Sequence, residues 1–471
     1  MTMDPVFWTV KDILTATGGE KAAGPDDLRF SGVSIDSRTA GESDLFVAVK
    51  GETHDGHRFI PDVMKKGVRG IVMARQKYSP QDRMPENVVC VLEDDTILAL
   101  GDLASFHRRR FGIFITAITG SNGKTTTKEM TASVLSRKFK TLKTAGNRNN
   151  HFGLPLTLLG LDPSHGAAVV ELGMNHPGEI RRLSAICRPD VGVITNIGPA
   201  HLEGLGGIED VMAAKGELIE NIAETGTIVL NTDDACCMKL SKTAARKVFF
   251  FGFSPAADVR AVDVIPKGDH MTFTLELPDR SIPVELKSPG EFMVKNALAA
   301  ASVGYLNGLS ADAIKDGLEG FLPVKGRMDI WKTRQGVFII DGFYNANPGS
   351  MEAAIRTLAQ LKGPGRGILV AGDMLELGKD AEQLHEAMGR LAARLGLEKI
   401  FHTGNFAPAV KKGACEAGMA DHRIFTGDKS EVTAALLEFI RPGDWVLVKG
   451  SRGAKTEDIV HRLEALDGPA A

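Results

Sequence analysis

Cysteine is scarce in this sequence, and long apolar runs are absent. The five cysteines form an odd set in which no two have Cys-x-x-Cys spacing: Cys90, Cys187, Cys236, Cys237 and Cys415. Neither a disulfide framework nor a thiolate zinc site is therefore indicated, which is typical of a reducing compartment. No window approaches the ~18 uncharged apolar residues that a membrane span requires. We therefore expect a cytoplasmic protein without a membrane span.

Net charge is also small. The chain has 56 Lys and Arg against 59 Asp and Glu, which gives a formal net charge of -3. Such a balance supplies no basic field for a nucleic-acid partner, and we expect none. With 43% hydrophobic and 24% charged residues, the composition is that of an ordinary globular protein. A length of 471 residues favours about three domains.

The pattern of apolar runs predicts an α/β protein with domains at residues 1–112, 113–324 and 325–471. Short apolar runs separated by turns predict a small α/β first domain. In the second, apolar runs at 167–173 and 191–198 flank a helix-like stretch, which predicts a parallel sheet covered by helices. The third repeats this alternation without a Gly-x-Gly-x-x-Gly motif, which predicts a Rossmann-like sheet that lacks the dinucleotide fingerprint.

The sharpest chemical signal is the stretch TGSNGKTTT at residues 119–127. It lies between a predicted strand and a predicted helix, where backbone N–H groups and the helix dipole attract phosphate. As in P-loop enzymes, Lys124 would neutralise phosphate charge and the Thr125 hydroxyl would bind Mg²⁺. The strict motif has glycine where Ile118 stands. An ordinary glycine turn before a helix is the alternative interpretation.

Two polar residues follow the next predicted strands of the central domain. Glu171 and His201 stand at or just past the carboxyl ends of these strands, the edge at which open α/β sheets bind ligands. A carboxylate suits Mg²⁺ well, whereas histidine is a less usual magnesium ligand. Both residues are predicted to face the phosphate loop, although each also fits a polar residue that is satisfied within its own loop.

Lys215 is a further candidate for a functional residue, although its position on the predicted helix does not itself support a function. It falls on a predicted helix within IEDVMAAKGELIENI, beside Ala213 and Ala214. A lysine in such a setting is most often a solvated surface residue. The local sequence therefore indicates no function for it.

Several motifs together carry a resemblance to a known family. They are TGSNGKTTTKE, GNRNNHFGLPLTLL, VVELGMNHPGEI, NIGPAHLEGLG, the AKGE around Lys215, YNANP, ILVAGDMLELG and VLVKGSRG. Along nearly its whole length the chain resembles the Mur ligase family. YNANP and GDMLELG resemble most the member that joins D-alanyl-D-alanine to UDP-N-acetylmuramoyl-tripeptide. The Asp-Asn-Pro-Arg-type motif expected of the sister ligase for a diamino acid is not found.

The resemblance implies an ATP-dependent ligase of peptidoglycan synthesis. The first domain would hold the uridine diphosphate sugar, the central P-loop-type ATPase domain ATP, and the C-terminal Rossmann-like domain the dipeptide. The tripeptide carboxylate would attack the γ-phosphate of ATP, and the dipeptide amine would then displace phosphate from the resulting acyl phosphate. ATP and two Mg²⁺ ions are the implied cofactors, and a monomer is expected.

The resemblance also implies roles for individual residues. ATP would be bound by Gly120, Ser121, Asn122, Gly123, Lys124, Thr125 and Thr126, with Asn296 at the adenine and Arg327 reaching the nucleotide from across the cleft. The implied metal ligands are Thr125, Glu171, His201 and Lys215, the last carboxylated by CO₂ on its side-chain nitrogen. The implied substrate contacts are Ser34, Asp36, Ser37, Arg38, Asn147, Asn149, Asn150, Tyr344, Asn345, Asn347, Lys449 and Ser451. Lys124, His201, Lys215 and Arg327 would be the catalytic residues.

Two positions depart from the family pattern. A His-Asn pair usually precedes the adenine contact, whereas this chain has Phe292 and Met293 there, so the adenine pocket is expected to be shaped differently. An aspartate usually stands two residues before the tyrosine of YNANP, but here that place is Gly342 and the acid is Asp341. A nucleotide role for Asp341 is therefore left open, as is the third residue of the tripeptide, diaminopimelate or lysine.

Two other classes share part of these signals. A P-loop GTPase switch would explain Lys124 and Thr125, but the Asn-Lys-x-Asp element that reads guanine is missing. A folate polyglutamylating ligase would share the central and last domains, but it would not need a uridine-type first domain. Activity with the two substrate pairs would separate the amide ligases.

Overall fold

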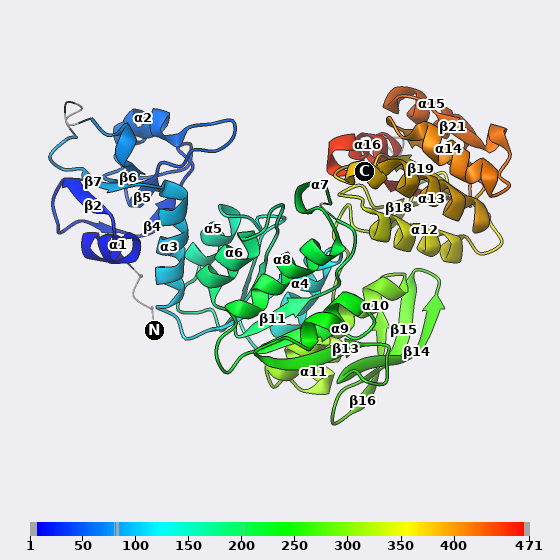
Figure 1. Ribbon diagram of the computed structural model, residues 1–471, viewed down its shortest axis with the longest axis horizontal. Helices are drawn as coiled ribbons and strands as arrows, with labels where there is room; N and C mark the ends of the chain where they lie inside the picture. The colour runs from blue at the N-terminus through cyan, green and yellow to red at the C-terminus, as the bar shows by residue number, and fades with distance from the viewer. Residues whose placement is uncertain (1–6, 80, 82–83, 201, 466–471) are drawn as a thin grey trace.

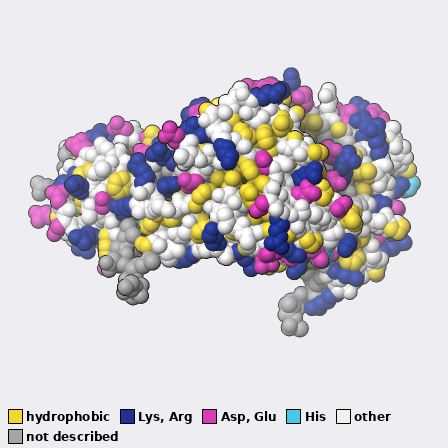
Figure 2. Space-filling model, turned by 90° about the horizontal axis from the view of Figure 1, so that it is seen from below, with side chains coloured by type: hydrophobic (Ala, Val, Ile, Leu, Met, Phe, Trp, Pro, Cys, Tyr) yellow, Lys and Arg dark blue, Asp and Glu magenta, His cyan; other side chains and the backbone are white. Residues whose placement is uncertain are grey.

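The computed structural model describes residues 7–79, 81, 84–200 and 202–465. They form three α/β domains in chain order, with the central domain between the other two (Figure 1). No helix among these residues is both long and apolar enough to cross a bilayer. On the face shown in Figure 2, basic and acidic side chains are interspersed.

The first domain is built on a five-stranded sheet in the order β2-β7-β6-β5-β4. β2 pairs antiparallel with β7, and the remaining strands pair parallel. The apolar runs GIVMA and VCVLE form the inner strands because every residue in them is buried. The elements are α1 (Val10–Thr17), β2 (Glu20–Ala23), β4 (Gly32–Ser34), β5 (Asp44–Val47), α2 (Ile60–Lys65), β6 (Gly70–Ala74), β7 (Val89–Glu93) and α3 (Thr96–Arg108), with a ribbon of β1 (Trp8–Thr9) and β3 (Arg29–Phe30).

The central domain has a nine-stranded sheet in the order β16-β15-β14-β13-β12-β11-β8-β10-β9. Apolar clusters cover both faces, one formed with α4, α10 and α11 and the other with α6, α8 and α9. The strands are β8 (Phe114–Thr119), β9 (Thr141–Lys143), β10 (Ala167–Glu171), β11 (Val191–Ile194), β12 (Thr227–Asn231), β13 (Lys247–Gly252), β14 (Val259–Lys267), β15 (His270–Glu276) and β16 (Ser281–Leu286). The helices are α4 (Lys124–Leu135), α5 (Gly153–Leu159), α6 (Glu179–Cys187), α7 (Leu202–Leu205), α8 (Ile208–Glu220), α9 (Ala235–Ser241), α10 (Glu291–Leu306) and α11 (Ala311–Glu319).

The sheet is parallel from β9 to β14, as the sequence predicts, but β14, β15 and β16 are antiparallel. Burial alternates along β15 and β16, which is typical of antiparallel strands with one covered face. Two residues, Gly268 and Asp269, connect β14 to β15, and Gly268 adopts the positive φ of 61° that such tight turns require. The predicted parallel sheet thus continues at this edge into three antiparallel strands.

The C-terminal domain has a six-stranded sheet in the order β17-β18-β22-β19-β20-β21. All neighbouring strands are parallel except β17, which pairs antiparallel with β18 at the edge. The predicted Rossmann-like alternation is thus confirmed, with one added edge strand. The elements are β17 (Asp329–Lys332), β18 (Phe338–Asp341), α12 (Pro348–Lys362), β19 (Gly367–Gly372), α13 (Ala381–Arg394), β20 (Lys399–Thr403), α14 (Ala407–Glu416), β21 (Ile424–Thr426), α15 (Lys429–Phe439), β22 (Trp445–Lys449) and α16 (Glu457–Ala465).

Strand order decides which residues meet at the central sheet edge. β8 lies between β10 and β11, with Ile118 opposite Glu171 and Thr119 opposite Ile194. Because the three strands are parallel, their carboxyl ends share one edge. The phosphate loop, Glu171 and the residues after Ile194 are thereby brought together. The domain boundaries at residues 112/113 and 324/325 stay a prediction.

Candidate active site

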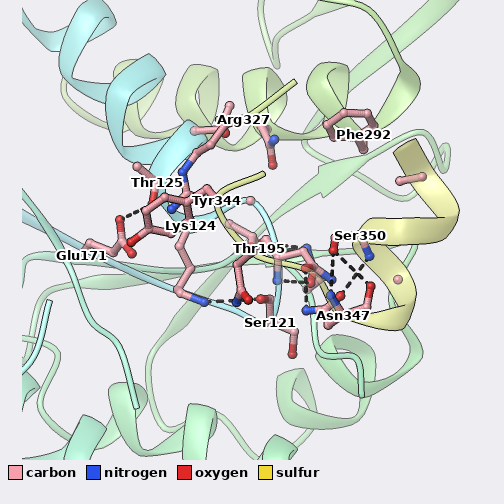
Figure 3. Close-up of a pocket in the computed structure, with 18 of the residues that line it drawn as sticks. Ser121, Lys124, Thr125, Glu171, Thr195, Phe292, Arg327, Tyr344, Asn347 and Ser350 are labelled. Carbon is pink, nitrogen blue, oxygen red and sulfur yellow. Dashed lines mark hydrogen bonds between the residues drawn. The ribbon is translucent and has the colours of Figure 1, made fainter. Parts of the chain in front are cut away.

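A cavity of about 500 Å³ lies between the central and C-terminal domains. The phosphate loop and the ends of β10, β11 and β12 line it from the central domain (Figure 3). The turn before β17, the loop before α12 and the end of β22 line it from the C-terminal domain. The site is therefore a composite of two domains.

The phosphate loop has the conformation that only its glycines permit. Gly120 and Gly123 have φ values of 148° and 80°. A Cβ on Gly120 would lie 2.0 Å from the Thr195 hydroxyl, and one on Gly123 would lie 2.3 Å from the Asn296 side-chain oxygen. The next loop also fixes the chain, because Asn196 accepts hydrogen bonds from the Ser121 and Asn122 amides at 2.9 Å. An ordinary turn would not need both constraints.

The start of α4 is open to a ligand. No side chain caps this helix end, so the amides of its first turn are available for an anion, including those of Thr125 and Thr126. Lys124, the first residue of the helix, folds back so that its ammonium donates to the carbonyls of Gly120 at 2.7 Å and Ser121 at 3.3 Å. Burial lowers the pKa of Lys124, an effect that Arg327 reinforces and Glu171 opposes.

Glu171 is held between the phosphate helix and the asparagine loop. The Thr125 hydroxyl donates to one carboxylate oxygen at 2.8 Å, and the Asn149 amide donates to the other at 2.7 Å. The side chain is 1% exposed, and Figure 3 shows Thr125 directed at it. Asn147 also lines the cavity. A carboxylate and a hydroxyl placed together form a suitable oxygen donor set for Mg²⁺.

Lys215 is buried, not solvated. Its exposure is 1%, it lines the cavity from α8, and it forms no hydrogen bond or ion pair within the part of the chain that the structure describes. Burial lowers the pKa of Lys215 well below its ordinary value, and the nearby Lys124 lowers it further. The expectation of a solvated surface lysine was wrong, because the helix turns this face toward the cavity.

Asn296 and Arg327 line the cavity from different domains. Asn296, on α10, accepts a hydrogen bond from the Thr127 hydroxyl at 3.2 Å, beside Gly123. Arg327 approaches from the C-terminal domain, with its guanidinium 4.0 Å from the centre of the Tyr344 ring (Figure 3). Burial lowers the pKa of Arg327. The turn that contains Arg327 is held in place, because the Gly326 backbone amide donates to the Asp341 carboxylate at 3.0 Å.

Besides Arg327, the C-terminal domain places four predicted residues on the cavity wall. Lys449, at the end of β22, donates to the backbone carbonyl of Asn345 at 2.8 Å. The Asn347 side-chain amide donates to the Asn122 side-chain oxygen at 2.8 Å. This hydrogen bond directly joins the C-terminal domain to the phosphate loop. Tyr344, Asn345, Asn347 and Lys449 all line the cavity.

Four buried or partly buried basic side chains line the cavity: Lys124, Lys215, Arg327 and Lys449. None forms a salt bridge with a carboxylate of the described residues. Desolvated cations are costly unless an opposite charge is provided. The site is therefore built for an anionic ligand.

Other predicted residues lie elsewhere. Ser34, Asp36, Ser37 and Arg38 belong to the first domain and do not line this cavity; Asp36 and Arg38 form an ion pair of 2.6 Å there. The Asn150 side chain accepts from the Phe152 and Gly153 amides, and the Ser451 hydroxyl donates to Ala346 and accepts from Leu375, so both brace local loops. His201 lies outside the described residues.

Several residues of the cavity were not predicted from the sequence. Thr195 and Asn196, which hold the phosphate loop, follow β11 in the same TNIG segment that precedes His201. Their position after a buried strand was the available signal. Asp233 and Lys295 form an ion pair of 3.2 Å at another part of the cavity wall, and no sequence signal links these two distant positions.

A second buried cluster, away from this cavity, consists of Asp373, His385 and His402. Both His385 nitrogens are already bonded, one to the Met374 amide at 2.9 Å and one to the Ala381 carbonyl at 2.6 Å. Its ring therefore has no nitrogen left for a metal ion.

Comparisons with known proteins agree with this geometry. Three family models match: "Mur ligase family, catalytic domain" at residues 29–108, "Mur ligase middle domain" at 118–304, and "Mur ligase, glutamate ligase domain" at 326–452. The UDP-N-acetylmuramoyl-tripeptide--D-alanyl-D-alanine ligase of Escherichia coli is 37% identical over 93% of this chain and 94% of its own. The ligase of the same name from Bacillus subtilis is 35% identical over 97% and 98%.

Solved structures show the same similarity. A crystal structure of MurF from Acinetobacter baumannii has a TM-score of 0.88 at 34% identity and covers 98% of this chain and 99% of its own. MurF from Thermotoga maritima in complex with ADP has a TM-score of 0.82 at 30% identity, covering 92% and 97%. A folylpolyglutamate synthase from Mycobacterium tuberculosis shares the fold alone, at 17% identity over 78% of this chain and 94% of its own, with a TM-score of 0.62. The chain thus belongs to the Mur ligase family.

Proposed function

We propose that this chain is an ATP-dependent amide ligase that joins D-alanyl-D-alanine to UDP-N-acetylmuramoyl-tripeptide through an acyl phosphate. The observation that carries the proposal is a pair of partly buried basic side chains that line the cavity without a salt-bridge partner among the described residues, Lys124 and Arg327. A triphosphate and a substrate carboxylate would supply the missing negative charge. The named ligases that match nearly the whole chain support this choice of substrates.

The protein's contribution is positioning and charge neutralisation. The tripeptide carboxylate attacks the γ-phosphate, and the dipeptide amine later attacks the acyl phosphate, so both nucleophiles belong to substrates. Lys124 from one domain and Arg327 from the other line the same cavity, so both would be available to neutralise charge on the transferred phosphate. Phosphoryl transfer is accelerated mainly by such alignment and by stabilising charge. Closing the cavity would keep water from the acyl phosphate.

The residues around Glu171 fit a magnesium ion. Its carboxylate and the Thr125 hydroxyl are 2.8 Å apart at the edge of the phosphate loop, and both are oxygen donors. Magnesium bound here would neutralise charge on the β- and γ-phosphates. The predicted ligand His201 stays a prediction.

Lys215 would fit a second magnesium ion only after modification. Its ammonium would repel the cation, whereas a lysine carboxylated by CO₂ presents an anion. The neutral amine is the form that reacts with CO₂, and burial favours that form by lowering the pKa of Lys215. We therefore propose that Lys215 is carboxylated.

A single chain would suffice for this reaction. The cavity walls that carry the predicted catalytic side chains come from two domains of one chain, so we propose that the enzyme acts as a monomer. We also propose that it works in the cytoplasm.

Phosphate release tests the proposed function. The protein, ATP and Mg²⁺ are incubated with UDP-N-acetylmuramoyl-tripeptide and D-alanyl-D-alanine, or with folate and glutamate. We expect rapid phosphate release only with the first pair, and only when both of its members are present. Comparable release with folate and glutamate would instead support the polyglutamylating alternative.

A further inference from the structure

Lys449 is a buried lysine on the wall of the cavity that the C-terminal domain provides. Its exposure is 6%, and its ammonium nitrogen lies 2.8 Å from the Asn345 carbonyl and 3.4 Å from the Gly342 carbonyl. Both partners are neutral. Within the described part of the chain no carboxylate forms a salt bridge with Lys449, and its direct partners are two backbone carbonyls.

The proposed reaction needs a proton acceptor at this wall. A free α-amino group has a pKa of about 8, so at neutral pH most of the dipeptide arrives as an ammonium that cannot attack. Three side chains of the C-terminal domain that line the cavity are ionisable: Arg327, Tyr344 and Lys449. Arginine is not deprotonated in proteins, and a neutral phenol is a poor base. Lys449 alone of these three can accept a proton near pH 7.

We propose that Lys449 is the general base that deprotonates the attacking amine of the dipeptide. This inference rests on the proposed function. The neutral Lys449 amine takes one proton from the dipeptide ammonium, and the freed lone pair forms the C–N bond at the acyl carbon. The bond between the acyl carbon and the oxygen that bridges to phosphorus then breaks, and its electron pair leaves with the phosphate. The departing phosphate takes the second amine proton, and Lys449 returns its proton to solvent.

The surroundings of Lys449 favour this role. Burial lowers the pKa of Lys449 to about 7, the Arg327 guanidinium contributes to the lowering, and Asp341 on the neighbouring strand opposes it. Tyr344 lies next to Arg327, and the Arg452 guanidinium lies 5.3 Å from the centre of the same ring. On the β19 side, the Asp373 carboxylate is taken up by hydrogen bonds from the Asn405 and Phe406 amides.

Hydroxylamine separates the base from a merely structural lysine. Hydroxylammonium is a much stronger acid than an alkylammonium, so at pH 7.5 hydroxylamine is mostly the neutral amine and attacks an acyl phosphate without a protein base. We expect Lys449→Arg, which is permanently charged and cannot accept a proton, to lose roughly a hundredfold or more in kcat with the dipeptide. The same variant should still form hydroxamate from ATP and UDP-N-acetylmuramoyl-tripeptide within a few-fold of wild type. An equal loss with both nucleophiles would overturn the proposal.

The pH profile provides a second test that does not depend on the arginine variant folding. Lys449→Cys is alkylated with bromoethylamine, which installs a lysine analogue of lower amine pKa, and identically treated wild type controls for the five native cysteines. A base must be neutral, so kcat should fall as the pH drops through its pKa. We expect the acid limb to move to lower pH in the alkylated variant. An unmoved limb would assign it to the dipeptide and refute the base.

Failure of the proposed function would look different. If wild type forms no hydroxamate from UDP-N-acetylmuramoyl-tripeptide and ATP, the acyl-phosphate ligase itself is wrong. If wild type forms hydroxamate and Lys449→Arg ligates the dipeptide normally, only the role of Lys449 is wrong.

Discussion

At the scale of single residues, Lys215 shows how burial changes the chemistry of a side chain. Its neighbours in the sequence are those of a surface helix, yet its ammonium is buried against a cavity and has no partner among the described residues. A buried unpaired ammonium is costly, and the cost falls when the amine is neutral or chemically modified. The position therefore carries a functional prediction that its local sequence does not.

Carboxylation of Lys215 predicts a specific pattern of chemical rescue. Lys215→Ala should lose activity a hundredfold or more, and acetate should restore part of it by occupying the vacated space as an anion. Lys215→Arg should not be rescued, because a permanent cation then stands where an anion is required. Steady-state phosphate release with and without acetate measures both. Equal rates for wild type and Lys215→Ala would exclude the carboxylated lysine.

The phosphate loop gives a second prediction at this scale. Lys124→Ala removes the ammonium that folds over the loop, and losing one such charge contact to a transferred phosphate costs on the order of a hundredfold or more in kcat. Hydroxamate formation should fall with overall ligation, because the first step is affected. Circular dichroism should show an intact fold. Near-normal turnover by a folded variant would refute the site assignment.

At the scale of elements, the N-terminus of α12 does two jobs through one residue. Asn347 caps the helix through two hydrogen bonds. Its side-chain oxygen accepts from the Ser350 backbone amide at 2.9 Å, and the Ser350 hydroxyl accepts from the Asn347 backbone amide. Its side-chain nitrogen meanwhile donates to Asn122 on the phosphate loop. A local capping motif thus also joins two domains.

Two substitutions at Asn347 separate these jobs. Asn347→Ala removes the cap and the contact, and should lower the free energy of unfolding by about 1 kcal/mol. Asn347→Asp keeps an oxygen for the cap but cannot donate to the Asn122 oxygen, so it should keep stability. Both variants should lose turnover several-fold. Urea denaturation and steady-state kinetics measure these effects. Full activity in Asn347→Asp would show that the interdomain hydrogen bond does not matter for catalysis.

At the scale of the whole molecule, the reacting groups come from two domains that fold around separate sheets. The C-terminal domain reaches the central one through Asn347, and the Glu203 amide donates to the Glu376 carbonyl at 3.3 Å across the same boundary. On the other side, α3 of the first domain packs on the central domain, where Arg182 and Asp102 form an ion pair of 2.8 Å. Few polar contacts of this kind would have to break for the C-terminal domain to move.

Domain closure is therefore predicted to accompany ligand binding. Small-angle scattering should show a smaller radius of gyration when a non-hydrolysable ATP analogue, UDP-N-acetylmuramoyl-tripeptide and D-alanyl-D-alanine are all present. The change should be reduced when only one ligand is added, because each contacts part of the site. An unchanged radius at saturation would argue against closure and leave the ligase chemistry untouched.

The sequence by itself determined the phosphate loop and the order of the three α/β domains. These features are local: a buried run predicts β8, the glycines at 120 and 123 permit the turn, and the helix follows at once. Strands alternating with helices also predict parallel sheets, because parallel neighbours need a crossover connection. The antiparallel edge formed by β14, β15 and β16 was not predicted from the sequence.

Only the tertiary structure decided which distant residues share the cavity and what burial does to them. The residues next to Lys215 and Lys449 in the sequence do not predict a lowered pKa for either lysine. Both pKa values are lowered by desolvation, which arises only when the chain is packed. Asn347 and Asn122 are 225 residues apart, and their hydrogen bond depends on how two domains meet. Sequence patterns report local backbone preference and amphipathicity, whereas solvent exclusion and long-range contacts belong to the folded molecule as a whole.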